Sequence, residues 1–136
     1  MKKKLMLLVT VAILATMVMT ACSLFGGGDD SGEITLDDLY YYSPGEYFVT
    51  NVKDSNVLCK TSVSIAMSGK EQTEFLETNN AVIRDTLVQI LRDNTEEELR
   101  ADDIIDILAE RMTTELRTAL GTEDVYYVYI NDFVVQ

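Results

Sequence analysis

The segment from residue 57 to residue 68 constrains the fold more than any other part of the chain, because its side chains alternate in character. One set is mostly apolar: Val57, Cys59, Thr61, Val63, Ile65 and Met67. The other set is mostly polar or small: Leu58, Lys60, Ser62, Ser64, Ala66 and Ser68. Successive strand residues point to opposite faces, so the alternation predicts a half-buried antiparallel strand. Cys59 is expected to be a small buried side chain on the covered face.

The last twelve residues, VYYVYINDFVVQ, predict a strand that is apolar on both faces. Strict alternation groups Val125, Tyr127, Tyr129, Phe133 and Val135 on one face, and Tyr126, Val128, Ile130 and Val134 on the other. For the single acid, Asp132, two interpretations remain open. It faces solvent, or it pairs with a basic residue such as Arg84 or Arg111, across the core or across a subunit contact.

Two segments before residue 57 complete the strand predictions. Residues 36–42 (LDDLYYY) are a short helix or an extended lead-in, and Ser43, Pro44 and Gly45 form a turn signal. Residues 45–54 are rich in aromatic and β-branched side chains, which favour a strand.

Helical periodicity begins after Gly69. Apolar residues recur at steps of three and four from Phe75 to about Arg92, with an interruption at Asn79 and Asn80. Residues 95–98 (TEEE) form a capping box. A long helix then runs to a left-handed C-cap at Gly121.

The order of these elements predicts an α+β fold. We expect a small sheet of about three or four mostly antiparallel strands, with two longer helices covering one face. The helices explain only one apolar face of the last strand. Its other face requires a second layer or a neighbouring chain.

The N-terminus has the composition of an export signal. MKKK opens the chain, and residues 5–21 carry no charge. We expect residues 1–21 to be a signal peptide or membrane anchor, with an apolar segment that includes Leu5, Leu8, Ile13, Leu14 and Val18. We expect residues 22–36 to form a flexible Gly- and Asp-rich tether, and residues 37–136 to form the exported domain.

The end of the apolar segment, MTAC, resembles a bacterial lipoprotein signal. The resemblance implies cleavage before Cys22 and lipidation of Cys22. The alternative is an uncleaved helical anchor with this cysteine at its outer end. Either anchor holds the exported part at the membrane.

Composition excludes several classes of function. The chain has 23 acidic and 11 basic residues, and loss of Lys2, Lys3 and Lys4 with the signal would change its net charge from −12 to −15. Nucleic acid is therefore a poor partner. The chain has no histidine, so the usual general base and the commonest transition-metal ligand are missing.

The acidic clusters do not predict a metal site. Asp102, Asp103 and Asp106 lack the glycine turn and the spaced acids of a calcium loop, and they suit the first turn of a helix instead. No base is available to activate a serine or threonine. We expect no cofactor and no enzymatic activity.

Four segments in this order carry a family resemblance: GEYFVTNVKD, CKTSVSIAMSG, AVIRDTLVQILRDNTEEEL and VYYVYINDFVVQ. Together, residues 45–136 resemble FliL, the flagellar basal body-associated membrane protein family. The closing strand is the most specific of the four segments, and the family typically ends with it. The family's usual anchor is an uncleaved spanning helix with a longer linker, which differs from the N-terminus here.

The resemblance implies a stomatin-type domain on the extracytoplasmic side of the cell membrane, at the flagellar basal body. It implies a ring-like homo-oligomer near the stator units that supports torque generation or stator engagement. The closing strand would then contact a neighbouring copy or partner through Tyr127, Tyr129, Asp132, Phe133 and Val135. The alternative is a generic exported lipoprotein that presents a small acidic domain to an unrelated partner.

Overall fold

The computed structural model describes residues 35–136. The predicted lipidation at Cys22, the membrane segment and nearly all of the tether lie outside the described residues. The described elements follow in the order η2 (Leu36–Asp38), β1 (Tyr40–Tyr42), β2 (Phe48–Asn51), β3 (Leu58–Met67), α2 (Gln72–Thr78), α3 (Asn80–Arg92), α4 (Glu96–Leu99), α5 (Ile104–Leu120) and β4 (Val125–Val135).

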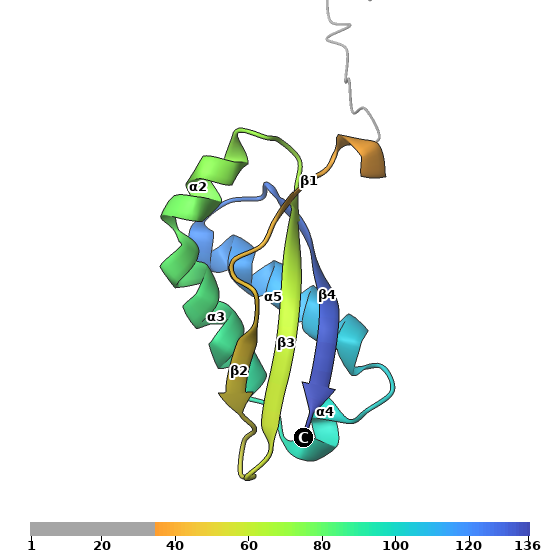
Figure 1. Ribbon diagram of the computed structural model, residues 1–136. Helices are drawn as coiled ribbons and strands as arrows, with labels where there is room; N and C mark the ends of the chain where they lie inside the picture. The colour runs from red at the N-terminus through yellow and green to blue at the C-terminus, as the bar shows by residue number, and fades with distance from the viewer. Residues whose placement is uncertain (1–34) are drawn as a thin grey trace, which may run out of the picture. The chain divides into compact units, whose positions relative to one another are not determined.

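The four strands form one antiparallel sheet with β3 at its centre (Figure 1). β4 pairs with β3 along its whole length and occupies one edge of that strand. β1 and β2 share the other edge, with β2 beside the first half of β3 and β1 beside its last residues. The α+β class and the small antiparallel sheet are therefore confirmed.

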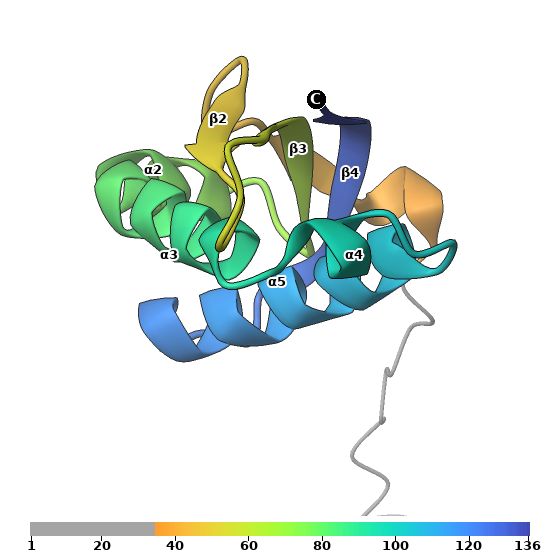
Figure 2. The same ribbon diagram turned by 90° about the horizontal axis from the view of Figure 1, so that it is seen from below.

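The helices cover one face of the sheet, and the other face has no covering layer among the described residues (Figure 2). The core lies between the layers. Cys59, Val63, Ile65 and Met67 of β3 pack there with side chains of α3 and α5 that include Ile83, Leu87, Leu108 and Met112. The alternation of residues 57–68 predicted this covered face.

Capping residues determine where several of the helices begin and end. The Thr95 hydroxyl accepts a hydrogen bond from the Glu98 N–H at 3.3 Å, and the Glu98 carboxylate accepts one from the Thr95 N–H at 2.7 Å, which confirms the capping box. Gly121 ends α5 with φ +64°, a left-handed conformation that glycine adopts without strain. Asn79 separates α2 from α3. Within residues 35–136, no helix is both long and apolar enough to span a bilayer.

The region before β3 differs in part from the prediction. Residues 36–42 combine the two predicted alternatives, since η2 is helical and β1 is extended. β2 is shorter than the predicted strand of residues 45–54 at both ends. Residues 43–47 form the turn that leads from β1 to β2, and residues 52–57 form the turn that leads to β3.

The predicted grouping of β4 side chains is wrong, because the strand contains two irregularities. The β3–β4 register shifts between Ser62 and Val63, and again between Ala66 and Met67. Each shift inserts an extra β4 residue, as in a β-bulge, and exchanges the faces of the residues that follow. The covered face therefore carries Val125, Val128, Ile130, Phe133 and Val135. The open face carries Tyr127, Tyr129, Asp132 and Val134.

Candidate interaction surface

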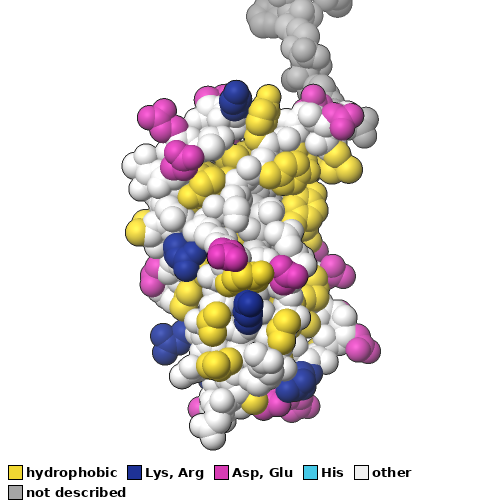
Figure 3. All heavy atoms as spheres, in the orientation of Figure 1, with side chains coloured by type: hydrophobic (Ala, Val, Ile, Leu, Met, Phe, Trp, Pro, Cys, Tyr) yellow, Lys and Arg dark blue, Asp and Glu magenta, His cyan; other side chains and the backbone are white. Residues whose placement is uncertain are grey.

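The open face of the sheet presents apolar side chains to solvent. In the orientation of Figure 1, hydrophobic groups gather over β1 and the neighbouring part of β4, and again over the opposite end of the sheet (Figure 3). The pairing register places the following exposed residues on this face: Tyr41, Val49, Leu58 and Val134. Surface of this kind, unlike single exposed apolar residues, is typical of interaction sites.

Two of the predicted contact residues, Tyr127 and Tyr129, form an aromatic cluster with Tyr41. The Tyr127 and Tyr129 ring centroids are 4.9 Å apart in an edge-to-face arrangement, and those of Tyr41 and Tyr129 are 6.0 Å apart. Partial burial raises the pKa of Tyr127, and the negative charges of Asp106 and Glu110 raise it further. The contact between Tyr41 and Tyr129 shows that the lead-in strand, β1, covers part of the closing strand, β4.

Asp132 lies on the open face and is exposed. Its carboxylate accepts a hydrogen bond from the Ser62 hydroxyl at 2.7 Å. Arg84 instead donates to the Pro44 carbonyl at 3.0 Å, and Arg111 pairs with Asp93 at 2.9 Å. Within the described chain Asp132 therefore faces solvent and pairs with neither arginine, while its pairing across a subunit contact stays a prediction.

Phe133 and Val135, the other predicted contact residues, lie on the covered face. Both are partly buried and pack against the core. The five predicted residues therefore do not form one patch. Tyr127, Tyr129 and Asp132 line the open face, whereas the side chains of Phe133 and Val135 face the core.

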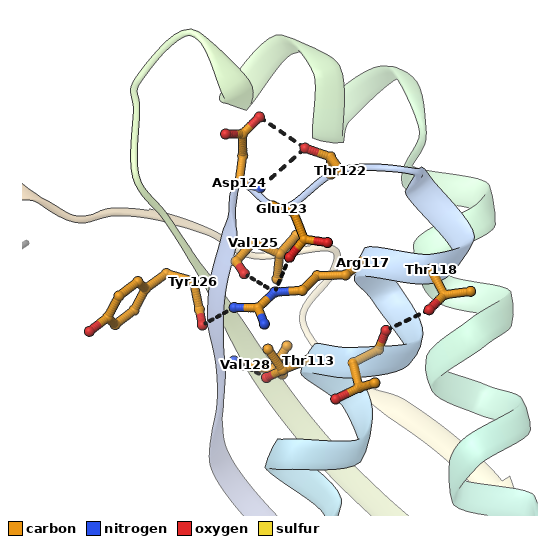
Figure 4. A network of polar contacts seen from close by, with 10 residues as sticks. Thr113, Arg117, Thr118, Thr122, Glu123, Asp124, Val125, Tyr126 and Val128 are labelled. Carbon is orange, nitrogen blue, oxygen red and sulfur yellow. Dashed lines mark hydrogen bonds and ion pairs between the residues drawn. The ribbon is translucent and has the colours of Figure 1, made fainter. Parts of the chain in front are cut away.

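Helix α5 blocks the outer edge of β4 along its first half (Figure 4). The buried Thr113 hydroxyl accepts a hydrogen bond from the Val128 N–H at 2.9 Å and donates one to the Ala109 carbonyl at 2.7 Å. The Arg117 guanidinium donates to the Val125 carbonyl at 2.8 Å and to the Tyr126 carbonyl at 3.1 Å. No further strand can pair at these positions.

Sequence reasoning missed this contact between Thr113, Arg117 and β4. A threonine and an arginine at an i, i+4 spacing beside the apolar stripe of a helix were its only signal. The partners of Thr113 and Arg117 are backbone groups of β4, and a pattern of side chains cannot predict contacts with backbone groups.

The second half of β4 presents an open edge. Leu58 and Gln136 exchange two backbone hydrogen bonds, so alternation along the ladder directs the N–H and C=O groups of Phe133 and Val135 away from β3. Among the described residues, only the Arg100 guanidinium reaches these groups, at 3.5 Å from the Val135 carbonyl.

Metal ligands and the one described cysteine are the other candidate sites to consider within residues 35–136. These residues contain no group of three or more potential ligands among Cys, Asp and Glu that could hold a metal ion. Cys59 is fully buried, and burial raises the pKa of its thiol to about 11.

Comparison with known proteins gives two matches. The family model described as flagellar basal body-associated protein FliL matches residues 41–136. The "Flagellar protein FliL" of Aquifex aeolicus (strain VF5) is 24% identical over 91 residues, which cover 65% of this chain and 56% of that protein. The aligned part thus spans little more than half of the curated relative.

Proposed function

The chain belongs to the FliL family of flagellar basal body-associated proteins, and from this premise we propose that it is an accessory protein of the flagellar motor. In this proposal the N-terminal segment holds the protein at the cell membrane, and the domain lies on the extracytoplasmic side. There it assembles near the stator units and supports stator engagement or torque generation. The family match, which spans nearly the whole described domain, is the observation that carries the proposal.

The surface of the domain supports an assembly role. It combines an apolar sheet face with an open strand edge, and both are means of binding other protein chains. The acidic charge of the chain argues against nucleic acid as the partner. We therefore propose further copies of the chain and proteins of the flagellar basal body as its partners.

The test is a clean deletion, with single motors observed under increasing viscous load. We expect torque or the number of engaged stator units to fall at high load, and the wild-type chain to restore it. Unchanged rotation at every load would contradict the motor role. It would favour an exported protein that presents the same domain to an unrelated partner.

The same deletion strain tests the anchor when it is complemented with the Cys22→Ser variant. If Cys22 is lipidated, the mature wild-type chain lacks residues 1–21 and carries the mass of the lipid, whereas Cys22→Ser keeps the segment and gains no lipid. If an uncleaved helix is the anchor, both chains keep residues 1–21, have no lipid mass and restore torque equally.

A further inference from the structure

We propose that copies of the chain assemble side by side, with the open edge of β4 in one copy pairing in parallel with the outer edge of β2 in the next. This inference rests on the proposed self-assembly and identifies the two surfaces that meet. It is carried by the register of the sheet, its charge distribution and the positions of two exposed valines.

The two open edges lie at the same height of the sheet. Thr61 of β3 pairs with Phe48 on one side and with Phe133 on the other. Cys59 likewise lies between Thr50 and Val135. A second copy placed beside the first, with no shift along the strands, therefore brings β4 level with β2 of its neighbour.

The hydrogen-bonding groups also match at this height. The Val52 N–H bonds to the Val57 carbonyl, so alternation directs the backbone groups of Phe48 and Thr50 toward β3 and those of Val49 and Asn51 outward. In the side-by-side arrangement Val135 of one copy lies level with Thr50 of the next. The outward N–H and C=O groups of Val135 therefore meet those of Val49 and Asn51, which flank Thr50. This is the pattern of a parallel pair, in which each residue bonds to the two neighbours of the residue opposite.

The side chains at this contact are apolar and complementary. Val49 and Val134 both pair with Lys60, one on each side, and both lie on the open face. They are 58% and 44% exposed within one copy. In the side-by-side arrangement Val134 lies directly beside the neighbour's Val49, so each covers the other.

Charge favours these edges over other surfaces of the same acidic chain. Lys60 and Asp132 are the only charged residues in the four described strands, and they have opposite signs. The helix layer, in contrast, carries runs of acids such as Glu96, Glu97 and Glu98. Two copies therefore meet with least repulsion through the sheet.

The helix layer is wider than the sheet, and this difference would make the assembly curve. In Figure 2 helices α2 and α3 extend beyond β2 on one side, and the start of α5 extends beyond β4 on the other. Neighbouring sheets can meet only if each copy is rotated about the strand direction so that the helix layers separate. Because the contact joins two different surfaces, repeated rotation gives a ring if it closes on the first copy, with the open faces turned inward.

Disulfide cross-linking of the full chain in membranes tests this arrangement. Adjacent strands lie about 4.8 Å apart, which is within the Cα separation of a disulfide. A chain with both Val49→Cys and Val134→Cys should give a ladder of dimers, trimers and larger products on oxidation. Each single variant alone should give no product, and the two single variants expressed together should give dimers only.

The matched control pairs Val134→Cys with Val82→Cys, because Val82 is 42% exposed but lies on α3. This pair and the wild-type chain, with its native cysteines, should give no ladder. Dimers from Val134→Cys alone would show antiparallel β4–β4 pairing and overturn the proposal. Absence of any ladder, or an equal ladder from the control pair, would also overturn it.

The result is independent of the motor experiment. If no ladder forms while the deletion loses torque, the pairing is wrong and the motor role stands. If the ladder forms while rotation is unchanged at every load, the pairing stands and the motor role is wrong.

Discussion

Arg84 fixes the turn between β1 and β2, and Gly45 makes room for it. The guanidinium donates to the Pro44 carbonyl and lies 4.5 Å from the centre of the Phe48 ring. A Cβ at Gly45 would collide with the Arg84 Nη1, and the Gly45 φ of +153° is unfavourable for other residues. We expect Gly45→Ala to lower the free energy of unfolding by about 1–3 kcal/mol, measured by urea denaturation.

Gly69→Ala is the matched control for this change. A Cβ at Gly69 would meet the end of the Glu71 side chain, which can move away, so a change within about 0.5 kcal/mol is expected. In an Arg84→Ala background the cost of Gly45→Ala should also become smaller, because the colliding group is gone. Equal costs for both glycines, or no coupling to Arg84, would contradict this account.

Thr113 is a buried polar residue whose role is to satisfy the backbone of β4. Thr113→Val keeps the shape of the side chain but leaves the Val128 N–H without its partner. We expect a loss of about 1–3 kcal/mol in the free energy of unfolding, with faster hydrogen exchange at Val128. Thr118→Val is the control, since the Thr118 hydroxyl only donates to the Thr114 carbonyl of its own helix. A similar loss in both variants would refute the specific role of Thr113.

Cys59 should make stability depend on pH in the alkaline range. Burial raises the pKa of its thiol from 9.0 to about 11, so below pH 9 the thiol is neutral in both the folded and unfolded chain. Between pH 9 and 11 the unfolded chain loses the proton first, and the free energy of unfolding falls as pH rises, by about 2 kcal/mol or less. Urea denaturation at several pH values should show this slope diminished in Cys59→Ala. An identical slope in both proteins would show that titratable groups other than Cys59 cause the pH dependence.

At the level of elements, the sequence predicts what depends on side-chain periodicity. The alternation of residues 57–68 predicted β3 and its covered face, and the glycine at 121 predicted the end of α5. It did not predict the two register shifts of β4. The shift at Tyr126 lies among residues that are all apolar or aromatic, Val125 to Ile130, so either face can be buried there and the pattern does not mark a bulge. The order of the strands also stays hidden, because it depends on contacts distant in sequence.

The capping box of α4 provides a prediction with an internal control. Thr95→Ala removes the acceptor for the Glu98 N–H from a short helix that buries Leu99, and a loss of about 1 kcal/mol is expected. Thr35→Ala removes a similar box from η2, which buries no residue, so it should leave global stability unchanged. Circular dichroism during thermal unfolding would measure both. Loss of stability in the Thr35 variant alone would contradict this ranking.

The Glu98 carboxylate belongs to the same box. Its hydrogen bonds from Thr95 lower its pKa below the ordinary value of 4.5. The stabilisation is therefore present above pH 4.5 and is lost as pH falls through the lowered pKa. The difference in the free energy of unfolding between Thr95→Ala and the wild type should accordingly be smaller at acid pH than at neutral pH.

For the whole molecule, the distribution of charge distinguishes binding to a basic partner from binding between copies of the chain. The chain has a net charge of −12, yet the strands within residues 35–136 carry one cation and one anion. A contact with a basic partner would use the acidic helix layer and would weaken as salt is added. A contact between copies through the sheet edges is opposed by the net charge and should strengthen instead.

This contrast gives a measurement on the full chain in detergent. Raising the salt concentration from about 0.05 M to about 0.5 M shortens the Debye length from about 14 Å to about 4 Å, which screens repulsion between acidic copies. We expect the average mass in sedimentation equilibrium to rise with salt for the wild type and to stay near that of the monomer for Val134→Lys. The lysine places an exposed charge beside the neighbour's edge, as natural edge strands do to prevent pairing. A mass that falls with salt would show that attraction between opposite charges holds the copies together, and that the acidic helix layer rather than the sheet edge is the contact surface.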